Sequence, residues 1–446
     1  MARLFGTDGI RGKANTAPVT PEIMLQLGKA LCQHFKDNGK DKIKVLIGKD
    51  TRLSGYMLET ALTSGLSSMG ATVYLVGPLP TPAIAHLTKS MSADLGLMIT
   101  ASHNPACDNG LKIFDRNGYK LSNEAEDLIE KYVFDDSSKM YSEEIGKVHR
   151  IDDAAGRYIE FVKSTINNYD LSGLKVVLDC ANGGAYKLAP IILKELGVEL
   201  IKIGTHPDGK NINLNCGALF PDLLAQKVLE QQADCGIALD GDADRLVIVD
   251  ELGNKMHGDC LTAVFAYDLH KKGLLKNNKI AVTTMTNTGF FMASKERDIE
   301  LELTDVGDRY LIEAMKKHDI SIGGEESGHI IFKDFATTGD GTLSALKLLE
   351  ILKEQKLKCS ELSKTITVFP SQLYNHLTNS KPPLEDLRHI QATNKDFQAS
   401  IGQEGKSLIR YSGTENKLRI LVEAKDESTV TEWIEKFKDA SNKDFA

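Results

Sequence analysis

Three aspartates alternate in the segment Asp240-Gly-Asp-Ala-Asp-Arg245, directly after a short apolar run. In extended backbone, alternate side chains point to the same side, so Asp240, Asp242 and Asp244 would share one face. Carboxylates this close repel one another unless a cation lies among them. Oxygen ligands favour Mg²⁺, Mn²⁺ or Ca²⁺ over zinc, and three aspartates leave coordination positions open for a phosphate. The segment therefore predicts a metal site, with Mg²⁺ as the preferred ion.

Two other interpretations of this aspartate segment are an EF-hand calcium loop and a solvated acidic turn. Asp240, Asp242, Asp244 and Glu251 have the spacing of positions 1, 3, 5 and 12 of an EF-hand calcium loop. An EF-hand needs glycine at position 6, where this chain has Arg245, and residues 246–249 form a predicted strand rather than a ligand-bearing loop. The EF-hand is therefore rejected. A solvated acidic turn is the remaining alternative to a metal site.

Ser102 is the first candidate nucleophile. A buried strand is predicted over Leu95–Ile99, and it ends in the polar segment Thr100-Ala-Ser-His-Asn-Pro105. A hydroxyl at the end of such a strand lies where α/β proteins place their chemistry. The GxSxG pattern of serine hydrolases is absent, and His103 is expected to face away from its neighbour. A turn or helix cap is the alternative. A phosphoryl group on Ser102 would carry a charge of about −1.5 to −2 and would complete the shell of a metal held by the aspartates.

Two further polar loops carry groups suited to a sugar phosphate. Glu325, Ser327 and His329 alternate after a predicted strand, and their acceptors and donors suit sugar hydroxyls. A second loop, near the end of the chain, combines two guanidiniums with hydroxyls and a glycine, as phosphate sites do. An ordinary polar turn is the alternative for both loops. The residues of the second loop are Arg410, Ser412, Gly413, Thr414, Asn416 and Arg419.

Each of the four loops falls in its own predicted domain. Short β-rich runs alternate with amphipathic helical patterns, as in strands 44–48 and 73–76 with the helix 58–69 between them. This alternation predicts an α/β fold, with three similar α/β sheet domains and a smaller C-terminal α+β domain. The predicted limits are 1–153 with the serine loop, 154–255 with the aspartate loop, 256–366 with the sugar loop and 367–446 with the phosphate loop.

The composition is that of an ordinary soluble protein. The chain has 446 residues, of which 41% are hydrophobic and 26% charged, and its formal net charge is −8. An acidic balance argues against nucleic-acid binding. The seven cysteines form no CxxC pair, which favours thiols in a reducing compartment. No apolar run has membrane-spanning length and the first residues lack a signal core, so we expect a cytoplasmic protein.

Together the four loops resemble those of the α-D-phosphohexomutase superfamily, in family order over nearly the whole chain. Within it, the chain is most similar to the bacterial branch that acts on glucosamine phosphates. The Asp-Asn-Gly-Leu-Lys and Val-Gly-Asp-Arg-Tyr stretches are the more specific ones. The segments that carry this closer resemblance are Phe5-Gly-Thr-Asp-Gly-Ile-Arg-Gly12, Ile47-Gly-Lys-Asp-Thr-Arg-Leu-Ser-Gly55, Asp108-Asn-Gly-Leu-Lys112, Asp153-Ala-Ala-Gly-Arg-Tyr158, Val177-Leu-Asp-Cys-Ala-Asn-Gly183 and Val306-Gly-Asp-Arg-Tyr310.

The resemblance implies four domains around a central active-site cleft and an isomerase that interconverts glucosamine 6-phosphate and glucosamine 1-phosphate. A phosphoserine and a 1,6-bisphosphate, which also serves as primer, would carry the phosphoryl group, and the product would feed UDP-N-acetylglucosamine and cell-wall synthesis. Ser102 would be the phosphoserine, and its phosphate would join the three aspartates around one Mg²⁺. Glu325 and Ser327 would hold sugar hydroxyls. Arg410, Ser412, Gly413, Thr414 and Arg419 would hold the non-reacting phosphate. The remaining catalytic candidates are Arg11, His103, Lys112, Arg245 and His329, with Lys112 and His329 as acid–base groups.

Other functions stay open on the sequence alone. These are a glucose or mannose phosphate mutase, a Mg²⁺-dependent sugar-phosphate phosphatase, and a silent sugar-phosphate sensor. An activating kinase is compatible with the sequence, as is a monomer or a homodimer.

Three residues depart from the usual family motifs. Ala243 stands where glycine is usual in the metal loop, and we expect ordinary backbone there rather than a positive φ. Asn416 stands where proline is common and would loosen the phosphate loop. Glu326 stands where a neutral residue is more usual. We hypothesise that Glu326 favours an amino sugar.

Overall fold

The structure is a computed structural model that describes residues 4–6, 8–135, 140–167, 169–412 and 416–445. Its contacts divide the chain into two compact units. The larger unit comprises residues 1–283 and 302–363, and the smaller comprises 284–301 and 364–446. Each unit is described by itself.

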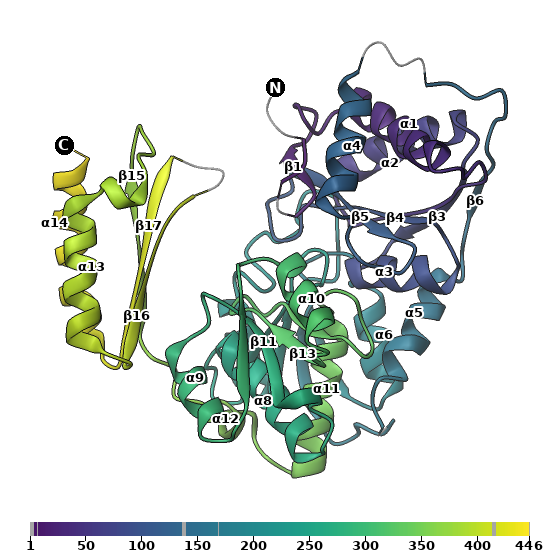
Figure 1. Cartoon of the computed structure of the whole chain (residues 1–446). Coiled ribbons are helices and arrows are strands. Elements are labelled where there is room, and N and C mark those ends of the chain that lie inside the picture. The colour runs from purple at the N-terminus through teal and green to yellow at the C-terminus, as the bar shows by residue number, and fades with distance from the viewer. Residues whose placement is uncertain (1–3, 7, 136–139, 168, 413–415, 446) are drawn as a thin grey trace. The chain divides into compact units, whose positions relative to one another are not determined.

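The first sheet of the larger unit has the strand order β1-β5-β4-β2-β3-β6. Strands β2, β3, β4 and β6 run parallel, whereas β5 is antiparallel to both β4 and β1. In Figure 1, α1, α2 and α4 lie on one face of this sheet and α3 lies on the other. The strands are β1 (Ile10–Lys13), β2 (Lys44–Lys49), β3 (Thr72–Pro78), β4 (Leu95–Ile99), β5 (Asp108–Asp115) and β6 (Val148–Arg150), and the helices are α1 (Pro21–Asp37), α2 (Ser54–Ser68), α3 (Thr81–Ser90) and α4 (Asn123–Phe134).

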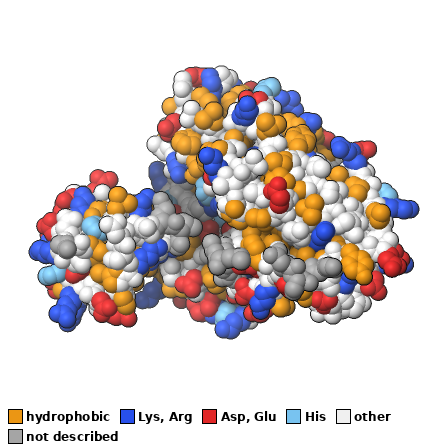
Figure 2. All heavy atoms as spheres, turned by 90° about the horizontal axis from the view of Figure 1, so that it is seen from above, with side chains coloured by type: hydrophobic (Ala, Val, Ile, Leu, Met, Phe, Trp, Pro, Cys, Tyr) orange, Lys and Arg blue, Asp and Glu red, His pale blue; other side chains and the backbone are white. Residues whose placement is uncertain are grey.

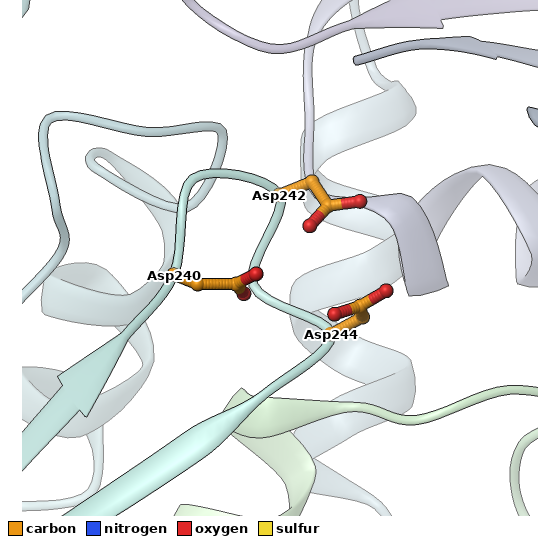
Figure 3. A group of neighbouring side chains, drawn as sticks. All are labelled: Asp240, Asp242 and Asp244. Carbon is orange, nitrogen blue, oxygen red and sulfur yellow. The ribbon is translucent and has the colours of Figure 1, made fainter. Parts of the chain in front are cut away.

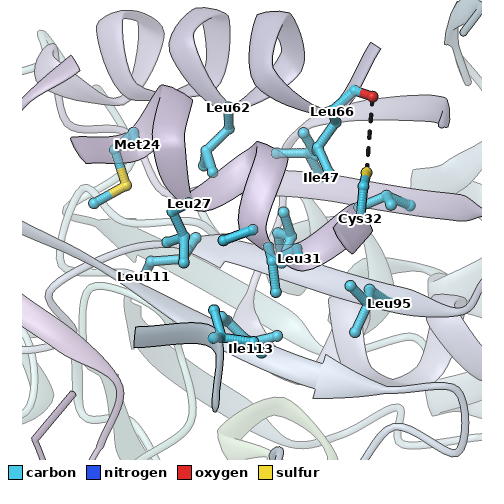
Figure 4. Close-up of a cluster of buried hydrophobic side chains, with 14 of the residues drawn as sticks. Met24, Leu27, Leu31, Cys32, Ile47, Leu62, Leu66, Leu95, Leu111 and Ile113 are labelled. Carbon is cyan, nitrogen blue, oxygen red and sulfur yellow. Dashed lines mark hydrogen bonds between the residues drawn. The ribbon is translucent and has the colours of Figure 1, made fainter. Parts of the chain in front are cut away.

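The core of this part lies between α1, α2 and the sheet. Leu27 and Leu31 of α1 pack with Leu62 and Leu66 of α2 over strand residues such as Ile47, and all five are fully buried (Figure 4). The two helices approach closely because glycines meet at their contact. A Cβ at Gly65 would lie 2.2 Å from the carbonyl oxygen of Leu25 on α1, so any side chain there would force the helices apart.

Two four-stranded sheets follow in the larger unit, with orders β10-β9-β7-β8 and β12-β11-β13-β14. Their strands are β7 (Lys175–Asp179), β8 (Glu199–Ile203), β9 (Cys235–Leu239), β10 (Leu246–Asp250), β11 (Lys279–Thr283), β12 (Glu300–Thr304), β13 (Ile322–Gly324) and β14 (Ile330–Phe332). The helices of this stretch in the larger unit are α5 (Ala154–Lys163), α6 (Leu188–Glu195), α7 (Asp222–Gln231), α8 (Gly258–Lys271), α10 (Asp308–Lys317), α11 (Gly341–Gln355) and α12 (Cys359–Leu362), whereas α9 (Thr288–Lys295) belongs to the smaller unit.

The three sheets share one feature that positions chemistry. In each, a buried strand ends in a polar loop and the chain returns as an antiparallel neighbour, in the pairs β4–β5, β9–β10 and β13–β14. These three loops are the predicted serine, aspartate and sugar loops. Each of them is therefore a hairpin connection anchored by backbone hydrogen bonds on both sides.

The smaller unit contains a three-stranded antiparallel sheet of order β15-β17-β16. Phe397, Trp433 and Phe437 of its helices pack against Ile420 and Val422 of the sheet. The predicted fold class, three α/β sheets and a smaller α+β C-terminal part, is confirmed. The elements are β15 (Ser371–Leu377), α13 (Arg388–Ile401), β16 (Gly405–Tyr411), β17 (Lys417–Ala424) and α14 (Glu427–Asp444).

The surface offers no large region of one character in the view of Figure 2, where hydrophobic, basic and acidic side chains are interspersed. None of the described helices combines the length and apolar composition needed to cross a bilayer.

Candidate active site

The loops of the three sheets meet at the aspartate triad. The hydroxyl of Ser102, in the loop after β4, donates a hydrogen bond of 2.7 Å to Oδ2 of Asp240, in the loop after β9. From the loop after β13, Nδ1 of His329 lies 3.7 Å from Oδ1 of Asp244. Residues more than 200 positions apart thus share one buried site.

The triad has the geometry of a cation site. One carboxylate oxygen from each of Asp240, Asp242 and Asp244 lies within 4.8 Å of the others, and all three side chains are buried. Figure 3 shows the three carboxylates projecting from one loop into a common space. Oδ1 of Asp242 and Oδ1 of Asp244 are buried and accept no hydrogen bond from the described residues. Because a buried carboxylate oxygen that accepts no hydrogen bond is costly, this donor set fits a hard divalent cation.

The other oxygens of the triad are already held by the protein. The ammonium of Lys112, on β5, lies 2.8 Å from Oδ2 of Asp242 and 2.7 Å from Oδ2 of Asp244. The hydroxyl of Thr81 donates to the same oxygen of Asp242 at 2.5 Å. Burial alone would lower the pKa of Lys112, but the carboxylates of Asp242, Asp244 and Asp8 outweigh it and raise that pKa well above its usual range. Lys112 therefore orients two of the aspartates and leaves their Oδ1 atoms toward the metal position.

Asp240 differs from its two neighbours. It accepts the Ser102 hydroxyl on Oδ2 and a long 3.3 Å bond from the N–H of Arg245 on Oδ1. Burial and the charges of Asp244 and Asp242 raise the pKa of Asp240 to about 8. The two neighbouring carboxylates thus oppose ionisation of Asp240, as is expected where three carboxylates share a site suited to a cation.

Ser102 is held in an unusual backbone conformation. Its φ is +50°, in the left-handed region that costs a non-glycine residue roughly 1–2 kcal/mol. Its hydroxyl lies 3.4 Å from Nδ1 of His103, so the expectation that these adjacent side chains face apart is wrong. The turn conformation rotates both toward one side. Burial, together with the charges of Arg245 and Arg11, lowers the pKa of His103 to about 4, which leaves the ring neutral at pH 7.

The expectation of ordinary backbone at Ala243 is also wrong. Its φ is +56° and its side chain is fully buried. The turn is closed by a 3.0 Å bond from the N–H of Ala243 to the carbonyl of Asp240, and the carbonyl of Ala243 accepts the N–H of Gly341 at 3.0 Å. These two bonds hold the left-handed turn, so the alanine tolerates the strain while the carboxylates keep their alternation.

His329 lies between two carboxylates, with Asp244 at 3.7 Å from Nδ1 and Asp308 at 3.5 Å from Nε2. Burial opposes a charge on the ring, but the two carboxylates outweigh it and raise the pKa of His329 to about 10. The N–H of Gly339 also points at Nε2 from 3.1 Å, which favours a neutral ring. The carboxylates prevail, because charge–charge attraction in a buried site exceeds one neutral hydrogen bond.

A second set of charges, which no sequence motif predicts as a set, is joined to the triad through Lys112. Lys120 forms ion pairs with Asp8 and, at 3.1 Å, with Asp308. Arg11, a predicted catalytic residue, pairs with Asp8 at 2.9 Å. Lys112 lies 3.6 Å from the same carboxylate. The motifs containing Asp8 and Asp308 were visible in the sequence, but nothing in their spacing indicated that Lys120 would join them.

The sugar loop lines one cavity together with residues of the serine and aspartate loops. His103, Asp240, Arg245, Glu326 and Ser327 all contribute to its wall. The carboxylate of Glu325 accepts the N–H of Gly307 and the hydroxyl of Ser327, each at 3.1 Å. The carboxylate of Glu326 lies 3.5 Å from Nε2 of His257.

The predicted phosphate loop belongs to the smaller unit. Arg410 and Arg419 face each other in register across β16 and β17, so two guanidiniums share one end of this sheet. Ser412 is buried, and its carbonyl accepts the ammonium of Lys381 at 2.8 Å. Gly413 and Thr414 lie outside the described residues.

Models of the phosphoglucomutase/phosphomannomutase family match four consecutive stretches of the chain. Domains I, II and III of that family match residues 2–140, 156–253 and 257–369, and its C-terminal domain matches residues 374–440. A protein called phosphoglucosamine mutase from Pelobacter propionicus is 47% identical and covers 99% of both chains. Its namesake from Citrifermentans bemidjiense is 49% identical over 97% of this chain and 96% of its own.

Solved structures show the same fold. A phosphoglucomutase/phosphomannomutase family protein from Burkholderia thailandensis superposes with a TM-score of 0.83 at 24% identity, over 99% of this chain and 97% of its own. An N-acetylphosphoglucosamine mutase from Aspergillus fumigatus, solved with GlcNAc-6P and magnesium, gives a TM-score of 0.70 at 18% identity over 99% and 96%. With full-length relatives at 47–49% identity and all four family domains in order, the chain belongs to the α-D-phosphohexomutase superfamily and, within it, to the phosphoglucosamine mutases.

Proposed function

We propose that this protein is an isomerase that interconverts glucosamine 6-phosphate and glucosamine 1-phosphate, and so supplies UDP-N-acetylglucosamine and cell-wall synthesis. The observation that carries the proposal is the 2.7 Å contact between the Ser102 hydroxyl and Asp240, inside a buried aspartate triad of a chain with these relatives. A serine beside a cation site suits a phosphoryl carrier better than an acyl-transfer nucleophile.

In this proposal Ser102 carries the phosphoryl group. Transfer breaks the bond between Oγ and phosphorus and forms one from phosphorus to the free hydroxyl oxygen of the substrate, whose proton passes to a base. The resulting 1,6-bisphosphate turns end for end, and Ser102 takes back the other phosphoryl group. The same bisphosphate serves as primer when Ser102 is unloaded, and an activating kinase is a second route.

Asp240, Asp242 and Asp244 would hold Mg²⁺ together with an oxygen of the Ser102 phosphate. The ion supplies positive charge where the phosphoryl oxygens become more negative. The buried Oδ1 atoms of Asp242 and Asp244 support this assignment, because they accept no hydrogen bond from the described residues. Arg245, which lines the same cavity, would share in that neutralisation.

The remaining residues are assigned by position. Lys112 and His329, both beside the triad, are proposed for acid–base roles, and because carboxylates raise the pKa of each they would enter as proton donors; Arg11 and His103 would lie at the edge of the phosphoryl group. Glu325 and Ser327, which already bond each other at 3.1 Å, would exchange that bond for sugar hydroxyls. The non-reacting phosphate would be held by Arg410, Ser412, Gly413, Thr414 and Arg419. We propose four domains with the limits given above, in a cytoplasmic monomer or homodimer.

The test is a mutase assay with glucosamine 6-phosphate and a trace of the 1,6-bisphosphate, combined with intact-protein mass spectrometry. Wild type should gain the mass of one phosphoryl group and turn over, and Ser102→Ala should do neither. Ser92→Ala is the matched control, since Ser92 also lies at positive φ in the same domain. A fully active Ser102→Ala protein would exclude the mechanism. Steady phosphate release without primer would favour a phosphatase, and rates on glucose and mannose phosphates compare the other mutase specificities.

A further inference from the structure

Arg52 is an arginine with no exposed surface, and it stands next to the serine loop. It follows β2, and its Nε donates to Oδ2 of Asp50 at 2.9 Å while its backbone N–H donates to Oδ1 at 3.0 Å. Asp50 also accepts the hydroxyl of Thr100 at 2.7 Å. The Asp50 carboxylate therefore balances the Arg52 charge and fixes the plane of its guanidinium.

The free edge of that guanidinium is bonded entirely to the backbone of the serine loop. Nη2 of Arg52 donates to the carbonyls of Ser102 at 3.0 Å and Asn104 at 2.8 Å. Nη1 donates to the carbonyls of Asp108, at 3.0 Å, and Pro105. The loop thus wraps its carbonyl oxygens around one buried cation, which determines the path of the chain on both sides of Ser102.

A second donor reaches the same carbonyls from the next domain. Nδ2 of Asn213 donates to Ser102 at 2.9 Å and to Asn104 at 3.0 Å. Asn213 is buried, and its own φ is +58°. The carbonyl of Ser102 consequently accepts hydrogen bonds from two donors, Arg52 and Asn213. A Cβ at Gly241, on the aspartate loop, would lie 2.5 Å from the same oxygen, so the space around it is filled.

These two hydrogen bonds constrain Ser102, whose backbone is strained. The left-handed conformation of Ser102 persists only if its surroundings hold it, and that conformation directs Oγ toward Asp240. The N–H of Ser102 is held as well, by the hydroxyl of Thr100 at 2.9 Å. If the peptide after Ser102 were free to rotate, the serine would relax to negative φ and its hydroxyl would leave the triad.

We propose that Arg52 and Asn213 are positioning residues for phosphoryl transfer, which hold the Ser102 carbonyl so that its side-chain oxygen stays at the aspartate triad. This inference rests on the proposed role of Ser102 as phosphoryl carrier. Neither residue touches the reacting atoms, so their loss should slow transfer without weakening the binding of the sugar phosphate.

The decisive variant is Asn213→Gly. Glycine adopts φ +58° without strain, so the substitution removes the amide and leaves the backbone path available. Asn215→Gly is the matched control, because Asn215 lies in the same loop at φ +52° and is exposed. We expect Asn213→Gly to lower kcat by about 10- to 100-fold, the loss that follows a small misplacement of a reacting group, with KM within about 2-fold of wild type. Arg52→Lys should have a larger effect, since an ammonium cannot span the same acceptors.

Two further measurements separate positioning from general stability. The first is the rate at which the 1,6-bisphosphate loads Ser102, followed by intact mass, which should fall in parallel with kcat. The second is the melting temperature, which should lie only modestly below that of Asn215→Gly, because Arg52 still bonds the two carbonyls that lose the Asn213 amide, so that the folded state persists at the assay temperature. The inference is overturned if Asn213→Gly keeps the kcat of its control, or if its losses lie in KM alone. If Arg52→Lys does not fold, the kcat and KM of Asn213→Gly still test whether the Ser102 carbonyl must be held. Absence of mutase activity in wild type would instead refute the proposed function, and the loading rate would then test the positioning role alone.

Discussion

Replacing Lys112 by methionine should make the stability of the protein depend on a divalent cation. The Lys112 ammonium is almost completely buried and bonds Asp242 and Asp244 at 2.8 and 2.7 Å. Removing one partner of a buried ion pair costs about 3–5 kcal/mol, because the remaining carboxylates are left without compensation. Unfolding entropy is about 2.1 cal/mol/K per residue, so in a unit as long as the larger one each kcal/mol shifts the melting temperature by about 1.4 °C, and the melting temperature in EDTA should fall by roughly 4–7 °C.

A divalent cation should restore most of that loss. An ion that binds only the folded state stabilises it by about 2.7 kcal/mol at a hundred times its dissociation constant. In wild type, Lys112 already neutralises part of the triad and repels the ion, so the gain on adding Mg²⁺ should be smaller there. The assay is the melting temperature of both proteins in EDTA and in saturating MgCl₂, which reports binding without any need for activity.

Lys120→Met is the matched control for this experiment. Lys120 is also a mostly buried lysine between two carboxylates, but its partners are Asp8 and Asp308 rather than the triad. It should therefore lose stability in EDTA by a similar mechanism and recover no more than wild type with Mg²⁺. An equal Mg²⁺-dependent increment in Lys112→Met, Lys120→Met and wild type would refute competition between Lys112 and the ion, and no increment in any of the three would refute a cation site at the triad.

Three further outcomes are expected. Burial raises the pKa of Asp340 from 3.8 to about 6, so this carboxyl stays protonated in the folded state at low pH and its ionisation opposes folding as the pH rises from about 4 through 6. By pH 7 helix α11 should have lost up to ~3 kcal/mol of local stability, which corresponds to about 2.2 pKa units. Hydrogen exchange would measure this loss, and Asp340→Asn should flatten its pH profile. Glu326→Gln should lower the kcat/KM preference for glucosamine over glucose phosphate by about 5-fold, which is the value of one half-exposed charge pair. Glu302→Gln removes a similar contact with a histidine elsewhere and should leave this preference unchanged. An unchanged ratio in Glu326→Gln would contradict the amino-sugar hypothesis. Ala243→Gly should change the free energy of unfolding by less than ~1 kcal/mol. Relief of the left-handed strain offsets both the greater entropy of the unfolded chain and the loss of one buried methyl. A larger change in chemical denaturation would show that the turn is held differently.

The sequence predicted best where a short pattern carries its own geometry. Alternation of Asp240, Asp242 and Asp244 was enough to predict a shared face, and the apolar run before Ser102 corresponds to β4 over the same residues. Helix α11 was missed because it is buried on nearly all sides, so it lacks the polar face that an amphipathic pattern requires.

The residues that contact the triad and Ser102 from distant parts of the chain could not be predicted from short sequence patterns. Lys112 meets Asp242 across 130 residues, and Asn213 meets Ser102 across 111, so only the packing of separate sheets brings them together. Ala243 misled for a different reason. Alanine normally avoids positive φ, and its conformation here is imposed by two backbone bonds that no local pattern predicts, one donated by Ala243 to Asp240 and one accepted from Gly341.

The charge arrangement links the metal loop to the serine loop. Lys112 bonds the Oδ2 atoms of Asp242 and Asp244, while Asp240 is bonded by the neutral hydroxyl of Ser102. Phosphorylation of Ser102 would replace that hydroxyl by a group of about −1.5 to −2 charge beside Asp240, which the described contacts alone do not offset. A divalent cation at the open Oδ1 atoms adds nearly the opposite charge at the same place. Loading of the serine and occupation of the triad should therefore stabilise each other, and the buried triad next to Ser102 is the feature that makes one dependent on the other.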